Sequence, residues 1–183
     1  MKNDWGRKTA AAVMALAIVC AIFIGGGRSV SALRKRVTDV FTLGENKDGL
    51  GIAGELQTIA TLAANMLTMA EKYLPDGDAA LENLRAARQT LAESDTPKES
   101  YRACADLEQA MQALYHRLGQ EALSDRDQQY REGFILQMNS SLNIIRHDAY
   151  NDAAQAYNDE ISRFPASVFA GLFGIGRLEY YGE

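Results

Sequence analysis

The feature that most constrains this chain is an uncharged segment of 19 residues near its start, from Thr9 to Gly27. Apart from Thr9 and three closing glycines, every residue in it is apolar. Because a helix rises about 1.5 Å per residue, the segment would reach about 28 Å, close to the roughly 30 Å hydrocarbon core of a bilayer. The sequence therefore predicts a transmembrane helix over residues 9–27, after a short polar tail over residues 1–8.

A cleaved signal peptide is the competing interpretation of the same segment. Lys2, Arg7 and Lys8 would form its basic region, and Val30-Ser31-Ala32 offers a small-residue cleavage site. However, the apolar run exceeds the usual length of about 7–15 residues, and Arg28 lies between it and the cut. We therefore favour a retained, single-pass anchor. Basic residues flank both ends of the segment, so the sequence does not choose the side of the membrane that the bundle occupies.

The remainder of the chain has the composition of an acidic, helical protein. The 183 residues include only three prolines, each at an expected helix boundary, and no window alternates convincingly with period two. Without residues 1–27 the chain holds 16 basic and 23 acidic residues, a net charge of −7. Since phosphate binding needs a basic surface, this balance argues against nucleic acid as a partner.

Apolar residues recur every three or four positions in several stretches, which is the periodicity of packed helices. The clearest heptad seam comprises Leu56, Ile59, Ala63, Met66, Ala70 and Tyr73, and it is followed by the turn Leu74-Pro75-Asp76-Gly77. A third helical stretch comes in two pieces. The first begins after Asp78, a predicted N-cap, and the second begins at the predicted capping box Thr96-Pro97-Lys98-Glu99.

These patterns predict an all-α fold, with an N-terminal transmembrane helix followed by an antiparallel four-helix bundle over residues 28–165. Its last helix is expected to be one long C-terminal helix of up to 40 residues, from about Asp125 to Phe164. Residues 166–183 form an apolar, glycine-broken tail. We expect the tail either to pack on the bundle or to lie in the membrane interface, with Tyr180 and Tyr181 at the level of the headgroups.

No motif in the sequence carries recognisable chemistry. His116 and His147 are the only histidines, and neither belongs to a metal-ligand spacing. The glycines between Gly49 and Gly54 follow no predicted strand, so a phosphate-binding turn is not indicated. We therefore predict that the protein is not an enzyme, with no catalytic residue, no metal and no cofactor.

The tripeptide Tyr-Asn-Asp occurs twice, at residues 150–152 and 157–159. Seven residues make about two helical turns, so each residue type lies on the same face as its copy. Paired asparagines can fix helix register, and tyrosines can bury their rings while each hydroxyl meets a partner. A structural role and a docking role are both open for the candidate residues Tyr150, Asn151, Asp152, Tyr157, Asn158, Phe164, Pro165, Gly171, Phe173 and Gly174.

The C-terminal segments together resemble the signature of the LemA family. They are the repeat, Arg163-Phe164-Pro165, Ala170-Gly171-Leu172-Phe173-Gly174 and the closing Glu179-Tyr180-Tyr181-Gly182-Glu183. The resemblance implies a bacterial protein with one membrane helix, an antiparallel four-helix bundle and no established activity. Where the family usually has Tyr-Asp-Leu-Ile-Pro-Asn-Leu, this chain reads Glu55-Leu56-Gln57-Thr58-Ile59-Ala60, so it resembles a divergent member.

We therefore expect a non-enzymatic scaffold or adaptor of the bacterial cell envelope, anchored in the inner membrane by a single helix. Its expected partners are the lipid bilayer and another envelope protein, or a second copy of itself through the heptad seams. The alternative is a lipid- or peptide-binding module at the membrane surface.

Overall fold

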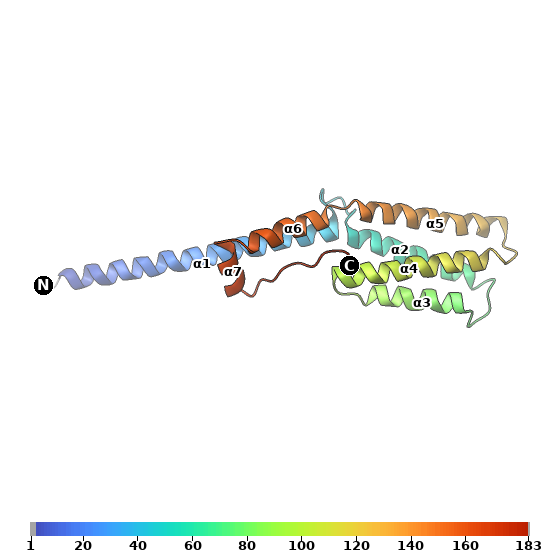
Figure 1. Cartoon of the computed structure of the whole chain (residues 1–183), viewed down its shortest axis with the longest axis horizontal. Helices are drawn as coiled ribbons and strands as arrows, with labels where there is room; N and C mark the ends of the chain where they lie inside the picture. The colour runs from blue at the N-terminus through green and yellow to red at the C-terminus, as the bar shows by residue number, and fades with distance from the viewer. Residues whose placement is uncertain (1–2, 183) are drawn as a thin grey trace. The chain divides into compact units, whose positions relative to one another are not determined.

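The computed structural model describes residues 3–182, with side chains from Ala10 onward. Residues 1 and 2 of the predicted polar tail lie outside the described residues. Within the described range the chain forms helices and no strand, so the predicted all-α class is confirmed (Figure 1). The helices are α1 (Asn3–Leu43), α2 (Ile52–Ala70), α3 (Ala79–Ala92), α4 (Pro97–Leu118), α5 (Asp125–Arg146), α6 (Tyr150–Ile161) and α7 (Ala166–Leu172).

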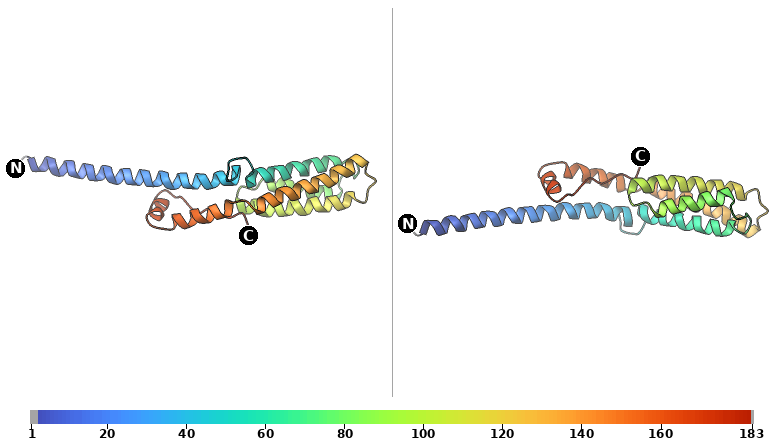
Figure 2. Two further views of the ribbon diagram at one scale, coloured as in Figure 1. Left: turned by 90° about the horizontal axis from the view of Figure 1, so that it is seen from above. Right: turned by 90° about the horizontal axis from the view of Figure 1, so that it is seen from below.

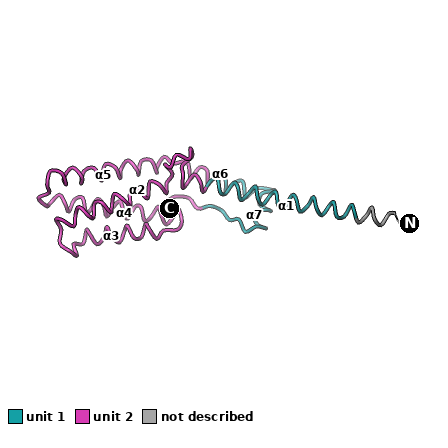
Figure 3. Tube along the Cα trace, turned by 180° about the vertical axis from the view of Figure 1, so that it is seen from behind, with its two compact units in different colours: residues 1–37, 155–178 teal, residues 38–154, 179–183 magenta. Residues whose placement is uncertain are grey.

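The chain folds into two compact units (Figure 3). The first unit comprises residues 1–37 and 155–178, and the second, which we call the bundle unit, comprises residues 38–154 and 179–183. Helices α1 and α6 and the C-terminal segment each contribute residues to both units.

Helices α2 to α5 form the antiparallel four-helix bundle (Figures 1 and 2). Helix α3 packs mainly on α4, and α2 packs mainly on α5. The expectation that α3 and α4 are two pieces of one helix is wrong, because the loop 93–96 reverses the chain between them. The predicted capping box is confirmed: Glu99 donates its backbone N–H to Thr96 Oγ1 at 3.3 Å, and Glu99 Oε2 accepts the Thr96 N–H at 3.2 Å. These bonds satisfy the first turn of a separate helix.

The predicted apolar seams form the core of the bundle. Asp78 caps α3 as expected, accepting the Ala80 N–H at 2.9 Å. The most buried side chains of α2 to α5, each with no exposed surface, are Ile59, Ala63, Met66, Ala70, Leu81, Leu84, Leu107, Met111, Leu114, Leu118 and Met138. Because these side chains pack inside their own bundle, the heptad seams are occupied within a single chain.

The predicted C-terminal helix of up to 40 residues is wrong, because the structure divides it into α5 and α6. Helix α5 ends at Arg146, and Asp148 Oδ1 accepts the Tyr150 N–H at 2.8 Å at the start of α6. An aspartate that bonds the backbone two residues ahead stabilises a new helix start in place of a continuous helix.

Helix α1 carries one segment that is long and apolar enough to cross a membrane, Ala10–Leu43, the single such segment in the described part of the chain, and its apolar run lies in the first unit. Its apolar side chains between Val13 and Ile24 are mostly exposed. The unit also contains the second part of α6, the short helix α7 and the extended residues that follow it.

Candidate functional site

The Tyr-Asn-Asp repeat binds the C-terminal segment of the chain through the segment's backbone. In the bundle unit, Asn151 donates from Nδ2 to the Tyr181 carbonyl at 2.9 Å, and its Oδ1 accepts the Tyr181 N–H at 2.8 Å. The Tyr150 hydroxyl donates to the Glu179 carbonyl at 2.7 Å. The Asn151 side-chain amide therefore pairs with both backbone groups of Tyr181, as the backbone of a neighbouring β-strand would.

The second copy of the repeat makes the same contacts inside the first unit. Asn158 donates to the Leu178 carbonyl at 2.9 Å and accepts the Leu178 N–H at 2.8 Å, while the Tyr157 hydroxyl donates to the Gly176 carbonyl at 3.2 Å. Asn158 is 1% exposed, and its amide is fully paired. An asparagine amide that meets both a donor and an acceptor in this way loses little on burial.

The spacing of the two contact sets follows from backbone geometry. Seven helical residues advance about 10.5 Å, and three extended residues advance about 10 Å. The contacted residues of the C-terminal segment are indeed three apart, Gly176 and Glu179 for the tyrosines and Leu178 and Tyr181 for the asparagines. A seven-residue repeat on the helix therefore matches a three-residue step along the extended segment.

Both tyrosine rings of the repeat are 2% exposed, so the expected burial of rings with bonded hydroxyls is confirmed. Burial raises the pKa of Tyr150 to about 12, with a further contribution from the negative charge of Glu179. Burial also raises the pKa of Tyr157, although the positive charge of Arg34 opposes the shift. Both hydroxyls therefore stay protonated donors over the physiological pH range.

An aromatic cluster holds the end of the chain in the bundle unit. Tyr181 lies edge-on to Tyr101 with ring centroids 5.4 Å apart, and Phe41 lies 5.0 Å from Tyr150 and 6.3 Å from Tyr181. Burial, followed by the neighbouring Cys104 thiol, raises the pKa of Tyr181. The expectation of Tyr181 at the level of lipid headgroups is therefore wrong, because its ring is buried among protein side chains. Sequence reasoning missed Phe41 and Tyr101, which carry no local signal of this contact.

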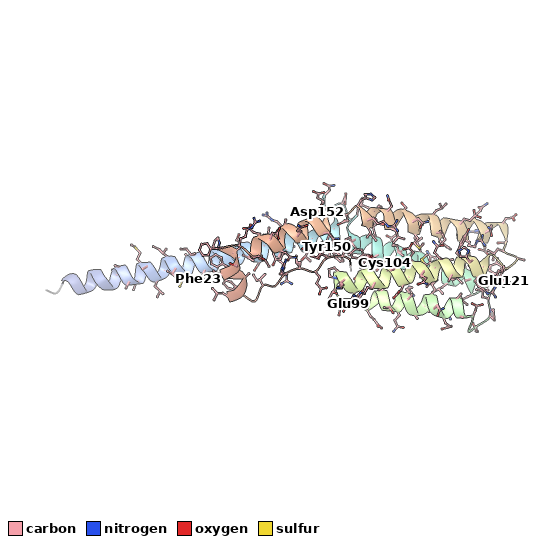
Figure 4. The ribbon with its side chains drawn as sticks, in the orientation of Figure 1. Phe23, Glu99, Cys104, Glu121, Tyr150 and Asp152 are labelled. Carbon is pink, nitrogen blue, oxygen red and sulfur yellow. The ribbon has the colours of Figure 1, made fainter. Side chains whose placement is uncertain are left out.

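The other candidate residues lie outside these contacts. Asp152 is exposed on α6 (Figure 4), and Phe164 is 84% exposed next to Pro165, which precedes α7. Gly171 is exposed on α7, and Gly174 follows that helix with φ +62°, a conformation that favours glycine. Phe164 and Pro165 thus lie in the turn between α6 and α7, and Gly174 lies just after the end of α7.

Phe173 belongs to a contact between α7 and α1 in the first unit. Its ring rests on Gly27, and the Phe169 ring rests on Gly26 and lies 5.9 Å from the Phe23 ring centroid. A Cβ atom at Gly26 would approach the Phe169 ring to 2.5 Å. The absence of side chains at the two glycines thus allows α7 to approach the α1 backbone.

The bundle unit also carries an open groove of about 610 Å³ between α2 and α3. Leu56 and Leu91 form its floor, and the small side chains of Ala53 and Ala60 lie seven residues apart on one wall. The groove is completed by Phe41, Gln57, Arg85, Arg88, Gln89, Ala92, Ser94, Asp95, Thr96 and Ser100.

Both histidines lie on the surface of the bundle unit. His116 and His147 are both exposed, and His147 Nδ1 lies 2.8 Å from the Asn143 carbonyl of its own helix. In the described part of the chain, no three histidine, cysteine, aspartate or glutamate side chains form a group that could hold a metal ion. The arrangement of the repeat supports binding to a peptide backbone.

Comparison with known proteins agrees with the C-terminal signature. The family model of the LemA family matches residues 50–182, which cover α2 to α7 and the C-terminal segment. A search of curated proteins found no match. The family match spans the bundle helices and both copies of the repeat, and the chain therefore belongs to the LemA family.

Proposed function

We propose that this protein is a non-enzymatic, membrane-anchored adaptor of the bacterial inner membrane that binds a partner envelope protein through the groove between α2 and α3. The groove is the observation that carries the proposal. The bundle seams are buried, so a partner could use them only by unfolding the bundle. The groove, in contrast, is open on the surface of the folded bundle, and the small side chains of Ala53 and Ala60 line one of its walls.

The wall of the groove suits an α-helix of the partner. Ala53, Gln57 and Ala60 follow the i, i+4, i+7 spacing along α2, so one stripe of the wall has small side chains on both sides of Gln57. An amphipathic helix can lay its apolar face along such a stripe. The open form of the groove along two helices favours a helix over a small molecule.

The groove lining contains two arginines, Arg85 and Arg88, and one anion, Asp95. The Arg85 guanidinium forms two ion pairs, one with Glu71 at the end of α2 and one with Glu82 on α3. The N–O distance is 2.5 Å in both. Among the described residues, the Arg88 side chain makes no hydrogen bond or ion pair. A carboxylate on the partner helix would therefore find a cation at Arg88 that is not already paired.

Site-specific photo-crosslinking in native membranes tests this proposal. A photoreactive residue in place of Gln57, in the groove, should give one discrete adduct with another envelope protein. The same residue in place of Gln137, exposed on α5, is the matched control and should give none. Arg88→Glu should reduce the Gln57 adduct several-fold, while Arg88→Lys should keep it. Equal adducts at the two positions, or a major adduct with a second copy of the chain, would contradict the proposal.

The alternative function, a lipid-binding module, has support from a different observation. Helix α7 exposes apolar side chains in the first unit, including Leu172 at 62% and Phe173 at 52%. Exposed apolar surface of this kind is typical of membrane or protein contact. The two functions are compatible, because the observations come from separate units.

A further inference from the structure

Helix α7 presents its two faces to different surroundings. Ala166 and Ala170 are buried, and Phe169 packs against Phe23 and Gly26 of α1. The opposite side of the helix is apolar and open to solvent, with Val168 and Leu172 both more than two-fifths exposed. Apolar side chains stabilise a fold when they are removed from water, so the outer face of this helix contributes no such free energy while it is exposed.

The exposed face of α7 lies beside the exposed end of the apolar run of α1. Phe23 and Ile24 on α1 are 37% and 58% exposed, and the contacts of Phe169 and Phe173 place α7 against residues 23–27. The exposed apolar surface of α1 from Val13 onward therefore continues onto α7. If α1 spans the bilayer from Ala10, its residues reach about 27 Å by Gly27, near the edge of the hydrocarbon core.

A pocket at this edge combines apolar and cationic walls. It has a volume of about 430 Å³ and is lined by Ile24, Gly27, Arg28, Ser31 and Phe173. Ile24 and Phe173 supply apolar surface, and Arg28 and Ser31 supply hydrogen-bond donors one helical turn further along α1. Among the described residues, the Arg28 guanidinium makes no hydrogen bond or ion pair. The order of apolar wall, then donors, matches the order of acyl chain and phosphate in a phospholipid.

The charge of the first unit favours an anionic lipid. Beyond the apolar run, residues 28–37 and 155–178 contain six basic and two acidic residues, a net charge of +4, whereas the whole chain has a net charge of −5. Basic residues next to a membrane helix are attracted to anionic leaflets. Arginine also binds phosphate in a bidentate geometry.

We propose that α7 lies in the interfacial layer of the bilayer and that Arg28 and Ser31 bind the phosphate of an anionic phospholipid, whose acyl chains lie against Ile24 and Phe173. This inference rests on the proposed membrane anchoring by α1. It assigns α7 a contact with lipid. Gly26 and Gly27 of α1 then serve to let α7 pack against α1 at the level of the bilayer interface.

Depth-dependent fluorescence quenching tests the position of α7. The full chain would carry Trp5→Phe, which removes the one native tryptophan, together with Leu172→Trp. In vesicles of phosphatidylcholine and phosphatidylglycerol, lipids brominated near the glycerol end of the acyl chain should quench this tryptophan strongly. Leu136→Trp, at a 70% exposed position on α5, is the matched control and should not be quenched. An unquenched Leu172→Trp variant in chains that still float with the vesicles would overturn the inference and leave the anchor intact.

Retention of lipid tests the phosphate site. Arg28→Gln should lower the phosphatidylglycerol that copurifies with the full chain several-fold, as measured by native mass spectrometry. Arg36→Gln removes the same charge from the same helix outside the pocket and should leave retention unchanged. Equal losses in the two variants would overturn the site, because they would indicate general attraction alone. Loss of flotation in the unmodified chain would instead indicate that the anchoring itself fails.

Discussion

Asn158 and Leu178 are joined by two hydrogen bonds, from Asn158 Nδ2 to the Leu178 carbonyl at 2.9 Å and from the Leu178 N–H to Asn158 Oδ1 at 2.8 Å. The asparagine thus satisfies both backbone groups of one residue in an extended segment. Because the Leu178 side chain takes no part, this contact depends on the identity of residue 158 and on the path of the backbone. The same relationship between Asn151 and Tyr181 makes the repeat a device for holding the chain's own C-terminal segment.

Asn158→Ala should lower the free energy of unfolding by about 2 kcal/mol, because it leaves the buried backbone groups of Leu178 without partners. The exposed Asn143 on α5 provides a control, and Asn143→Ala should change stability by less than about 0.5 kcal/mol. Urea unfolding of the full chain in detergent gives the free energies, and amide exchange at Leu178 reports the local loss. Equal stability of the two variants would show that the two hydrogen bonds contribute nothing.

Gly26→Ala should displace α7, because the added methyl group would approach the Phe169 ring to 2.5 Å. Gly25→Ala is the matched control, since nothing lies within 4 Å of a Cβ atom at that position. Hydrogen exchange measured on a peptide covering α7 should become faster in the Gly26 variant alone. If exchange changes equally in both variants, the contact between α7 and α1 is not the one described.

The Tyr150 hydroxyl should make the stability of the fold depend on alkaline pH. Its pKa is raised from 10.0 to about 12 in the folded chain, mainly by burial. The phenolate is therefore favoured in the unfolded chain, and the stabilising effect of the neutral group is complete below pH 10.0 and is lost as pH rises toward about 12. Tyr150→Phe should be less stable at neutral pH through its missing bond to Glu179, but it should lose less stability over this alkaline window. Urea midpoints measured at several pH values test this, and parallel curves for the two proteins would contradict it.

Thr96→Ala should cost about 1 kcal/mol of stability, because it removes one half of the capping box at the start of α4. Thr90→Ala is a suitable control, since the Thr90 hydroxyl bonds only to the Ala86 carbonyl within the exposed surface of α3. Thermal unfolding of both variants gives the comparison. A Thr96 variant as stable as the Thr90 variant would mean that the capping box does not stabilise the bundle.

The bundle core and its helix starts could be predicted from sequence because their signals are local. The spacing of Leu107, Met111 and Leu114 alone predicts a buried helix face. The Thr96 capping box is likewise contained within four consecutive residues. The chain reversal between α3 and α4 could not be predicted from helical periodicity, since two helical pieces separated by a short loop fit either a kinked helix or a hairpin. Packing between helices decides that question, and periodicity contains no information about it.

The break between α5 and α6 and the partners of the repeat could not be predicted. No proline or glycine marks the break, and the one signal is Asp148, placed two residues before the first helical N–H of α6. The partners of Asn151 and Asn158 lie 30 and 20 residues away, in an extended segment without periodicity. The sequence could indicate that the repeated side chains share a face, but only the structure reveals that the face binds the C-terminal segment.

The membrane-anchored adaptor is tested most directly by the intact mass of the mature chain recovered from its own membranes after washing with alkaline carbonate. We predict that the chain stays in the washed membranes and that its mass includes residues 9–27, as a retained anchor requires. A chain released by the wash, with a mass that begins after the small residues at Val30-Ser31-Ala32, would contradict the account.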